Sequence, residues 1–464
     1  KAVKAAREFE KFDQQGVDKI VEAVYHIAFD NRIHLARMAY KETGIGILND
    51  KILKNVIATR FVYRDIKNLK TVGIISEDHD KGIMEIARPL GPVFAITPLT
   101  NPTSTVLFKI LISLKSRNPI IISPHGAARK SSIEAAKICY ETAVDAGAPE
   151  NCIQWLKRTS KEEALELMGN KNIAMVLATG SVGLVRAAYS SGNPAIGIGP
   201  GNVPVYIDKE TNPSFAVEQI FVSKTFDNGT ICASEQALVV HQDQLEEVIN
   251  EFKFRKAYFL SEEEIKKLEP IAFNKTMKVM NVEVIGKSAH VIARMAGFEV
   301  PTDTTLLIAP LNEVGMHAPL SFEILAPILA FYSVEDFEAG LKMCKEINIH
   351  GGLGHTVSIF TSNEENLKRF ALELNAGRVV VNTPSSQGAM GGTYNTLTPS
   401  LTLACGTPGK NTTSDNISAK HLLNIQRIAR RRFRLCANHL HECHYLDENI
   451  NSVSIRDVCL RHYE

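Results

Sequence analysis

Short apolar runs alternate with longer segments of helical periodicity along this sequence, and the alternation restricts the possible folds more than any other feature. In the first half, apolar runs at residues 93–96, 119–122 and 172–178 are separated by helical segments near 106–113 and 131–146. Strands that are buried on both faces lose their polar–apolar alternation, and helices between successive strands imply right-handed crossovers in a mainly parallel sheet. We therefore expect a doubly wound α/β lobe in this half.

A second α/β lobe is expected because the same pattern restarts further along the chain. Its predicted strands lie at residues 236–240, 305–308, 328–332, 356–360 and 377–381. We place the boundary near Phe226, just ahead of a glycine-containing loop, because a site between two lobes usually draws residues from loops at the crevice. The predicted division is a first domain at 1–70 and 89–226, a second at 227–420, and a C-terminal strand and tail at 421–464.

A β-hairpin arm is predicted at residues 71–88, within the first lobe's sequence. Two apolar runs, at 72–75 and 83–86, flank a polar stretch whose Asp and Gly residues suit a chain reversal. An exposed strand edge invites pairing with another chain. We therefore expect this arm to mediate oligomerisation, as a homodimer or a larger assembly.

Composition excludes several classes of protein. The 52 Lys and Arg residues nearly balance the 51 Asp and Glu residues, which argues against long-range attraction to nucleic acid or anionic lipid. No apolar run approaches the ~18–20 residues that span a bilayer, and the first residues lack the apolar stretch of a secretion signal. The eight scattered cysteines form no disulfide framework. We expect a globular cytoplasmic protein with no nucleic-acid or membrane partner.

Cys232 and Asn101 are candidates for chemistry. Cys232 follows a turn at the predicted lobe boundary, where a thiolate can face a cleft and be stabilised by backbone amides. A lone cysteine is more often a small core residue, and that alternative stays open here. Asn101 stands between two prolines after a buried strand, so it could donate rigidly to a developing oxyanion or simply serve the turn.

The stretch 171–185 is typical of a strand, a tight glycine turn and a helix. Such a turn lets backbone N–H groups at a helix start face a phosphate, so its residues Thr179, Gly180, Ser181 and Gly183 are candidates for binding a nucleotide. Two glycines are fewer than the full three-glycine pattern, and an ordinary β–α turn is the alternative. The second glycine-rich stretch, 197–202, contains a proline and leads into a strand, so we interpret it as a close-packed loop.

Two ionisable residues in apolar surroundings complete the candidates. Glu323 must either pair with another group or bind a ligand hydroxyl. His355 follows a flexible glycine loop into a strand, where it could act as an acid or base near neutral pH or could pack the loop.

Taken together, these stretches resemble the aldehyde dehydrogenase superfamily, and within it the CoA-acylating branch. That branch includes the acetaldehyde dehydrogenase half of bifunctional aldehyde-alcohol dehydrogenases and the ethanolamine-utilisation enzymes. The resemblance runs from about residue 9 to 432. It is most specific at residues 96–103, 224–236, 354–356 and 382–388.

The resemblance implies an α/β fold with two doubly wound lobes and an oligomerisation arm, and it implies roles for the candidate residues. Cys232 would be the nucleophile, Asn101 and the Cys232 backbone N–H would form the oxyanion hole, and residues 179–183 would be the cofactor turn. Glu323 would hold the nicotinamide ribose, and His355 could deprotonate the incoming CoA thiol. Pro124 and His125 stand where hydrolytic members carry a cofactor-binding lysine, so they are assigned to the cofactor site.

Hydrolytic members also carry a glutamate base where this sequence has Gly197 and Ile198. Without that base water is hard to activate, and a thiol becomes the natural acceptor. The resemblance therefore implies an NAD-dependent, CoA-acylating oxidoreductase that interconverts a short aldehyde such as acetaldehyde and its acyl-CoA, with CoA as co-substrate. The alternatives are a hydrolytic enzyme that releases a free acid and a non-catalytic assembly component.

The C-terminal tail departs from the family. It carries five Arg residues between 427 and 434 and a Cys- and His-bearing segment at 436–444. The crowded spacing lacks two separated ligand pairs, so we expect no metal site. A role in docking to a partner or to the shell of a bacterial microcompartment is the hypothesis for this tail.

Overall fold

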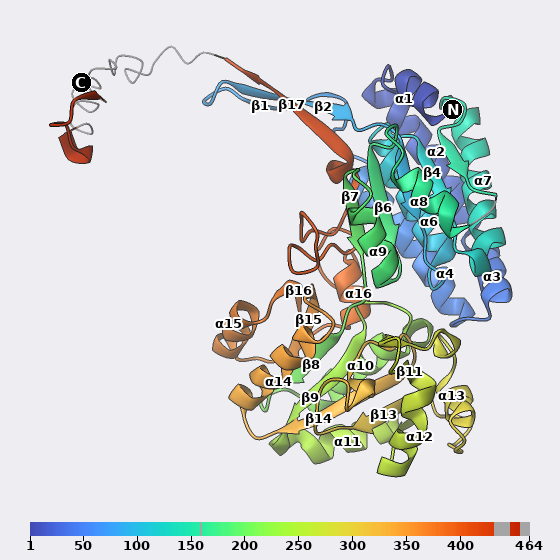
Figure 1. The fold of residues 1–464 in the computed structure, drawn as a ribbon, viewed down its shortest axis with the longest axis vertical. Coiled ribbons are helices and arrows are strands. Elements are labelled where there is room, and N and C mark those ends of the chain that lie inside the picture. The colour runs from blue at the N-terminus through green and yellow to red at the C-terminus, as the bar shows by residue number, and fades with distance from the viewer. Residues whose placement is uncertain (158–159, 431–445, 455–464) are drawn as a thin grey trace. The chain divides into compact units, whose positions relative to one another are not determined.

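The computed structural model describes residues 1–157, 160–430 and 446–454 (Figure 1). The chain divides into two units. The first comprises Lys1–Thr71 and Pro89–Leu423, and the second comprises Val72–Arg88 and the chain from Asn424 onward. Within the described ranges, no helix is both long enough and apolar enough to cross a membrane.

The first unit opens with helices, as the periodicity predicts. They are α1 (Ala2–Phe9), α2 (Gln14–Asp30), α3 (Arg32–Thr43), α4 (Leu48–Val56), a π-helical turn (Ile57–Phe61) and α5 (Val62–Ile66). The Asp13 side chain accepts a hydrogen bond from Gly16 N at 2.8 Å and so caps α2. The apolar face of α2 packs against α6 (Pro102–Lys115) and α7 (Arg129–Asp145).

A five-stranded parallel sheet forms the core of the first lobe, in the order β5-β4-β3-β6-β7. Its strands are β3 (Val93–Ile96), β4 (Ile120–Ser123), β5 (Ile153–Trp155), β6 (Met175–Thr179) and β7 (Ala195–Ile198). Helices α8 (Lys161–Met168) and α9 (Val182–Tyr189) cover one face, and α6 and α7 lie on the other (Figure 1). The strand order reverses between β3 and β6, and in open α/β sheets ligands bind outside the carboxyl ends of the strands at such a point.

The second lobe contains a seven-stranded parallel sheet in the order β10-β13-β14-β9-β8-β15-β16. Its strands are β8 (Val203–Ile207), β9 (Glu235–His241), β10 (Ala257–Phe259), β13 (Leu306–Pro310), β14 (Ile328–Val334), β15 (Gly354–Phe360) and β16 (Ala376–Val381). Helices α10 (Pro213–Thr225) and α11 (Leu245–Phe254) contribute to the core on one face, and α14 (Phe337–Ile349) and α15 (Glu364–Glu373) to the core on the other.

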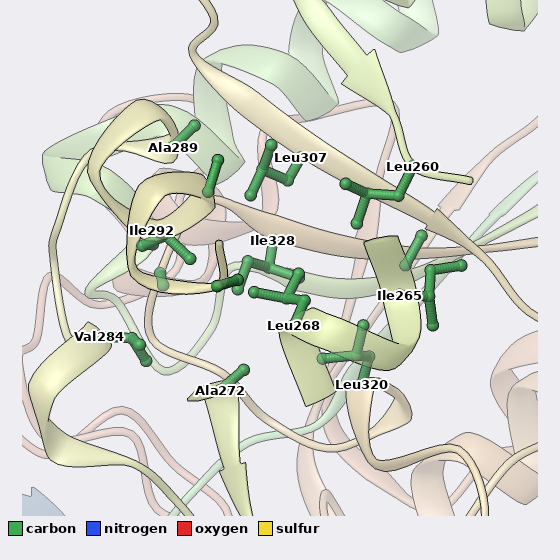
Figure 2. Close-up of a cluster of buried hydrophobic side chains, with 14 of the residues drawn as sticks. Leu260, Ile265, Leu268, Ala272, Val284, Ala289, Ile292, Leu307, Leu320 and Ile328 are labelled. Carbon is green, nitrogen blue, oxygen red and sulfur yellow. The ribbon is translucent and has the colours of Figure 1, made fainter. Parts of the chain in front are cut away.

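A further apolar cluster extends this core beside β13 and β14. Figure 2 shows its buried side chains, which come from α12 (Glu262–Ala272), α13 (Ala289–Met295), strands β13 and β14 and the neighbouring loops. Leu268, Ile292 and Leu307 are fully buried there. Two mainly parallel α/β lobes are therefore present, as the alternation of strand and helix segments predicts.

The expected boundary at Phe226 is wrong for the segment just before it. Strand β8 and helix α10 were assigned to the first lobe, but β8 lies between β9 and β15 and so belongs to the second sheet. The chain therefore changes sheet between β7 and β8. The apolar run of β8 predicts a buried strand without saying which sheet it joins, because pairing depends on residues far along the chain.

The second unit contains the predicted hairpin. Strand β1 (Gly73–Asp78) pairs antiparallel with β2 (Ile83–Pro89), and β17 (Leu423–Ala429) joins the other edge of β2. A salt bridge of 2.9 Å joins Arg427 to Glu85 across β17 and β2. Most of the Arg-rich run, the Cys- and His-bearing segment and the last ten residues lie outside the described residues.

Candidate active site

Cys232 follows a turn with unusual backbone geometry. Helix α10 ends at Thr225, and Asp227, Asn228 and Gly229 then adopt φ angles of +50°, +54° and +72°. The left-handed region is unfavourable for residues with a Cβ, so such a turn persists only where surrounding contacts hold it. The Cys232 side chain is half-buried. Burial, Glu323 and Cys405 raise the pKa of Cys232 to about 12 against the opposing effect of Arg378, so the thiol is protonated at neutral pH in this state.

Asn101 stands at the start of α6 and does not cap it. An asparagine at this position usually accepts a hydrogen bond from the first turn of its helix, but the Asn101 side chain makes no such bond. Its Oδ1 instead accepts from Lys54 Nζ at 2.6 Å, and its Nδ2 donates to Thr100 Oγ1 at 3.1 Å. The half-buried amide is therefore oriented by a residue on another element.

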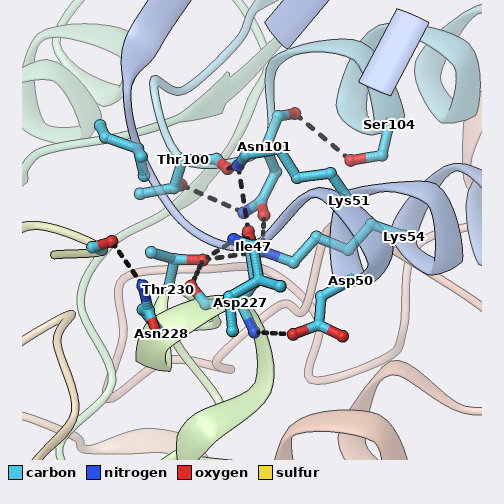
Figure 3. A network of polar contacts seen from close by, with 12 residues as sticks. Ile47, Asp50, Lys51, Lys54, Thr100, Asn101, Ser104, Asp227, Asn228 and Thr230 are labelled. Atoms are coloured by element: carbon cyan, nitrogen blue, oxygen red, sulfur yellow. Dashed lines mark hydrogen bonds and ion pairs between the residues drawn. The ribbon is translucent and has the colours of Figure 1, made fainter. Parts of the chain in front are cut away.

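A buried polar network joins Asn101 to the turn before Cys232 (Figure 3). Lys54 Nζ also donates to Asp227 Oδ2 at 2.5 Å and to Thr230 Oγ1 at 2.8 Å. Lys51 Nζ donates to Asp227 Oδ2 at 3.1 Å and to the Thr100 carbonyl at 3.3 Å. Both lysines project from α4, and their side chains are almost completely buried.

Two further hydrogen bonds fix the position of Asp227. Ile47 N donates to Asp227 Oδ1 at 2.6 Å, and Asp227 N donates to Asp50 Oδ2 at 2.7 Å. Burial works against the charged form of Asp227, but Lys54 and Lys51 outweigh it and lower the pKa of this carboxyl. No role was predicted for Lys51, Lys54 or Asp227. The only signal was two lysines three positions apart in a helix, a pattern that normally indicates a solvated face.

Gly201 brings three other site residues together. Gly201 N donates to Glu323 Oε1 at 2.8 Å. A Cβ at position 201 would lie 2.4 Å from the Cys232 carbonyl oxygen and 2.9 Å from the His355 ring, so only glycine fits there. This confirms the close-packed loop predicted for residues 197–202. Burial raises the pKa of the half-buried Glu323 to about 7.

His355 is completely buried, with Nδ1 3.0 Å from Thr356 Oγ1. Its Nε2 has no hydrogen-bond partner in the part of the protein that the structure describes. Burial and Arg378 lower the pKa of His355 to about 3, so the ring is neutral throughout the physiological range. The expectation that it exchanges protons near neutral pH is therefore not supported, and the packing alternative fits this structure better.

The candidate cofactor residues other than Glu323 lie at the carboxyl ends of the first sheet's strands. Thr179 ends β6, and the Ser181 side chain accepts from Leu184 N at 3.4 Å at the start of α9. A Cβ at Gly180 would lie 2.8 Å from Leu184 Cδ2, whereas one at Gly183 would meet no atom within 4 Å. Gly183 therefore borders open space, as a phosphate-binding turn requires. The two residues after β4 differ, since Pro124 is buried and His125 is exposed.

Lys109, on α6, is hydrogen-bonded to the backbone of β3 and β6 beside this turn, and no role was predicted for it. Its ammonium group donates to the carbonyls of Ile96 and Leu177 at 2.7 and 2.9 Å and to Thr179 Oγ1 at 3.1 Å. Burial lowers the pKa of this fully buried lysine to about 7. A lysine within an otherwise apolar helix was the available signal.

The family is decided by comparison with known proteins. Residues 1–396 match the model of the aldehyde dehydrogenase family. The chain belongs to this family. An aldehyde-alcohol dehydrogenase of Streptococcus pneumoniae serotype 4 is 44% identical over 412 residues, which cover 87% of this chain and 47% of that protein. This aldehyde dehydrogenase chain thus spans about half the length of that curated relative.

Solved structures agree with the family assignment of this aldehyde dehydrogenase. The crystal structure of an acetylating aldehyde dehydrogenase from Geobacillus thermoglucosidasius is 47% identical, with a TM-score of 0.90 and coverage of 93% of this chain and 95% of that one. A propionaldehyde dehydrogenase from Rhodopseudomonas palustris, solved with bound CoA and an acylated cysteine, is 25% identical. Its TM-score is 0.84, and the match covers 92% of this chain and 95% of that one.

Within the described ranges, no group of three or more His, Cys, Asp or Glu side chains is arranged to hold a metal ion. The Cys- and His-bearing segment of the tail lies outside those ranges.

Proposed function

We propose that this chain catalyses the NAD- and CoA-dependent interconversion of a short aldehyde and its acyl-CoA through a thioester on Cys232. One observation carries the proposal. The turn that precedes the half-buried Cys232 is joined through Lys54 to the Asn101 amide, so a nucleophile and an oxyanion donor are held by one network. The acetylating relative and the propionaldehyde dehydrogenase with bound CoA support the choice of CoA as acceptor.

The reaction begins when the Cys232 thiol, which is protonated in this structure, loses its proton to water and the resulting thiolate attacks the aldehyde carbon. The carbonyl electron pair moves to oxygen, and Asn101 Nδ2 and the Cys232 backbone N–H donate to the resulting oxyanion. Bound NAD supplies the acceptor for the hydride that leaves this carbon. The CoA thiol loses its proton to water and its thiolate attacks the Cys232 thioester, and the Cys232 sulfur leaves as a thiolate that takes up a proton again. The net products are acyl-CoA, the reduced cofactor and the proton of the CoA thiol.

The residues for holding NAD fit the group. The turn at residues 179–183 presents an open glycine face at the start of α9, where N–H groups and the helix dipole favour a phosphate. Glu323 offers a half-buried carboxylate to the nicotinamide ribose. Pro124 and His125 follow β4 at the same edge of the sheet and complete the assignment.

A hydrolytic outcome is disfavoured by the packing around Gly197, where hydrolytic members are expected to carry their base. A Cβ at this position would lie 2.7 Å from Val185 Cγ1. The Tyr189 hydroxyl accepts a hydrogen bond from Gly197 N and donates one to Gly197 O, both at 2.9 Å. A glutamate therefore has no room at position 197, and CoA is the acceptor we propose.

The test is an NADH-formation assay with acetaldehyde, in the presence and absence of CoA. NADH should accumulate only with CoA, and Cys232→Ala should abolish its formation. Cys139→Ala, which alters another buried thiol, should retain activity and serves as the matched control. Full turnover without CoA would establish the hydrolytic alternative. Retained CoA-dependent activity in Cys232→Ala would overturn the mechanism.

Self-association through the hairpin arm is proposed alongside this activity. Strands β1 and β17 are the two edge strands of the three-stranded sheet, and within the described residues neither pairs with a further strand. Light scattering should give a dimer or a larger assembly, whereas a stable monomer would contradict the idea. We also propose that the protein resides in the cytoplasm or in a bacterial microcompartment, and that its tail docks to a partner or to the microcompartment shell. The test compares how much of the full chain, and of the chain truncated after residue 434, associates with shell particles. Equal association with and without the tail would contradict the docking role.

A further inference from the structure

We propose that Lys54 is a positioning residue that determines which end of the Asn101 amide faces the substrate and fastens that amide to the turn carrying Cys232. The proposal deepens the proposed function and rests on the role of Asn101 as an oxyanion donor. It gives a catalytic consequence to a buried side chain on α4, an element outside both parallel sheets.

The first step concerns the ammonium group itself. A lysine ammonium has three donors and no acceptor. The three acceptors of Lys54 are Asn101 Oδ1 at 2.6 Å, Asp227 Oδ2 at 2.5 Å and Thr230 Oγ1 at 2.8 Å. Each donor can therefore be used once, and Lys54 is fully buried. A buried ammonium whose donors are all satisfied holds a fixed geometry.

The second step concerns the amide. The two ends of an asparagine amide have nearly the same shape but opposite hydrogen-bonding character. Because Lys54 can only donate, it accepts no bond from Nδ2 and requires Oδ1 to face it. Asn101 Nδ2 is then directed to the other side, where it contacts Thr100 Oγ1 at 3.1 Å. An amide turned by 180° would present an acceptor to the developing oxyanion and would repel it.

The third step connects the amide to the nucleophile. Thr230, two residues before Cys232, donates to Asp227 Oδ2 at 2.9 Å and accepts from Lys54. Asp227 has a positive φ and receives bonds from Lys54 and from Lys51. The Lys54 ammonium is therefore shared between the oxyanion donor and the strained turn, and this sets the two parts of the site relative to each other.

Lys51 provides a matched control within the same network. It also projects from α4, is nearly as buried as Lys54 and binds the same Asp227 oxygen. Its other contact is the Thr100 carbonyl and not the Asn101 side chain. A role confined to neutralising Asp227 would make the two lysines equivalent, whereas the proposed role applies to Lys54 alone.

The experiment measures kcat, the KM for aldehyde and thermal unfolding for Lys54→Met, Lys51→Met, Asn101→Ala and the Lys54→Met/Asn101→Ala double variant. Removing one oxyanion donor typically lowers kcat by about 10²–10³-fold, and we expect Lys54→Met to approach that loss with KM changed by less than about threefold. In the Asn101→Ala background, Lys54→Met should lower kcat by no more than about threefold, because the amide it orients is gone. Lys51→Met should lower kcat by less than about tenfold at a comparable loss of thermal stability.

A double variant that removes both charges separates a loss of catalysis from a loss of folding. Lys54→Met alone removes one of the two lysine partners of the buried Asp227 carboxylate, so Lys54→Met/Asp227→Asn removes the cation and the anion together. We expect this folded variant to keep the large loss in kcat, and Asp227→Asn alone to lose less. The proposal is overturned if the compensated variant turns over at nearly the normal rate, if Lys51→Met is as slow as Lys54→Met, or if the losses from Lys54→Met and Asn101→Ala multiply. If Asn101→Ala is itself fully active, the oxyanion assignment of the proposed function has failed instead.

Discussion

The cofactor turn and the nucleophile turn differ in what holds them. The cofactor turn, residues 179–183, is a local β–α connection whose cap comes from Ser181, three positions before the amide that it accepts from. The turn at Phe226–Gly229 is held by Lys51 and Lys54, which lie 176 and 173 positions away from Asp227. A local turn is specified by neighbouring residues, whereas a strained turn that carries a nucleophile depends on a distant, buried and charged network.

The largest effect expected from this difference is on stability at Asp227. Asp227→Ala leaves Lys51 and Lys54 buried without their carboxylate, and breaking a buried pair in this way typically costs about 3–5 kcal/mol. Urea unfolding monitored by circular dichroism measures the change. A loss in the free energy of unfolding below about 1 kcal/mol, the range of an exposed ion pair, would contradict the difference between the two turns. The distant network would then contribute no more than a surface contact.

The next effect is on catalysis without a matching effect on stability. Asn101→Ala should lower kcat by about 10²–10³-fold, equivalent to about 3–4 kcal/mol in the barrier. Because the Asn101 side chain does not cap α6, the loss of stability should be confined to its two hydrogen bonds, with Lys54 and Thr100, at about 1–3 kcal/mol. Paired steady-state kinetics and urea unfolding test this. A large loss of stability would indicate that Asn101 serves mainly the turn.

A smaller, pH-dependent effect is expected on cofactor binding through Glu323. Its pKa is raised to about 7, so it is mostly protonated at pH 6 and mostly ionised at pH 8. A charged acceptor strengthens a hydrogen bond by about 1 kcal/mol, so affinity for NAD should rise about fivefold across this interval. The affinity is measured at both pH values by adding NAD and following the quenching of the protein's intrinsic fluorescence. Glu323→Gln is the control and should show no rise in affinity.

Glu323 also affects stability, and here the pH dependence is opposite: affinity for NAD should rise with pH, whereas the stability that Glu323 contributes should fall. A carboxyl whose pKa is raised on folding keeps its proton to a higher pH in the native state than in the unfolded state. The contribution of Glu323 to stability should therefore fall as the pH rises from about 4.5 to about 7, and Glu323→Gln should remove this part of the pH dependence. An identical pH profile of stability in the two proteins would contradict the raised pKa.

The smallest effect belongs to the local turn. Ser181→Ala removes the side chain that accepts from Leu184 N, and loss of such a cap typically costs about 1 kcal/mol. Activity should persist, with the KM for NAD raised more than the KM for aldehyde. Differential thermal unfolding and the two KM values test this. A loss of stability as large as that of Asp227→Ala would show that the two turns do not differ in how strongly they are stabilised.

Much of this organisation is predictable from short stretches of sequence. The alternation of strand and helix segments predicted both α/β lobes, and the polar stretch between two apolar runs predicted the hairpin. The glycine-containing strings at the cofactor turn and before Cys232 pointed to residues that lie at strand ends and turns. These features are local, since they depend on residues within a few positions of one another.

The features that escaped prediction are non-local. Strand β8 joins the second sheet through β15, about 150 positions later, and no pattern within β8 indicates that partner. The low pKa of His355 arises from burial and from Arg378, which a lone histidine in the sequence does not show. Lys54 resembles a solvated charge in the sequence, and Lys109 stands in an apolar helix; the acceptors that surround each of them come from other elements and are not visible in the local sequence.

The crowding at Gly201 has a practical consequence for redesign of this enzyme. A Cβ at this residue would meet the Cys232 carbonyl and the His355 ring, and the Gly201 N–H donates to the Glu323 carboxylate. Any side chain at this position would displace the Cys232 peptide and the His355 ring at once, so variation aimed at new aldehydes should leave residue 201 untouched and begin at other residues.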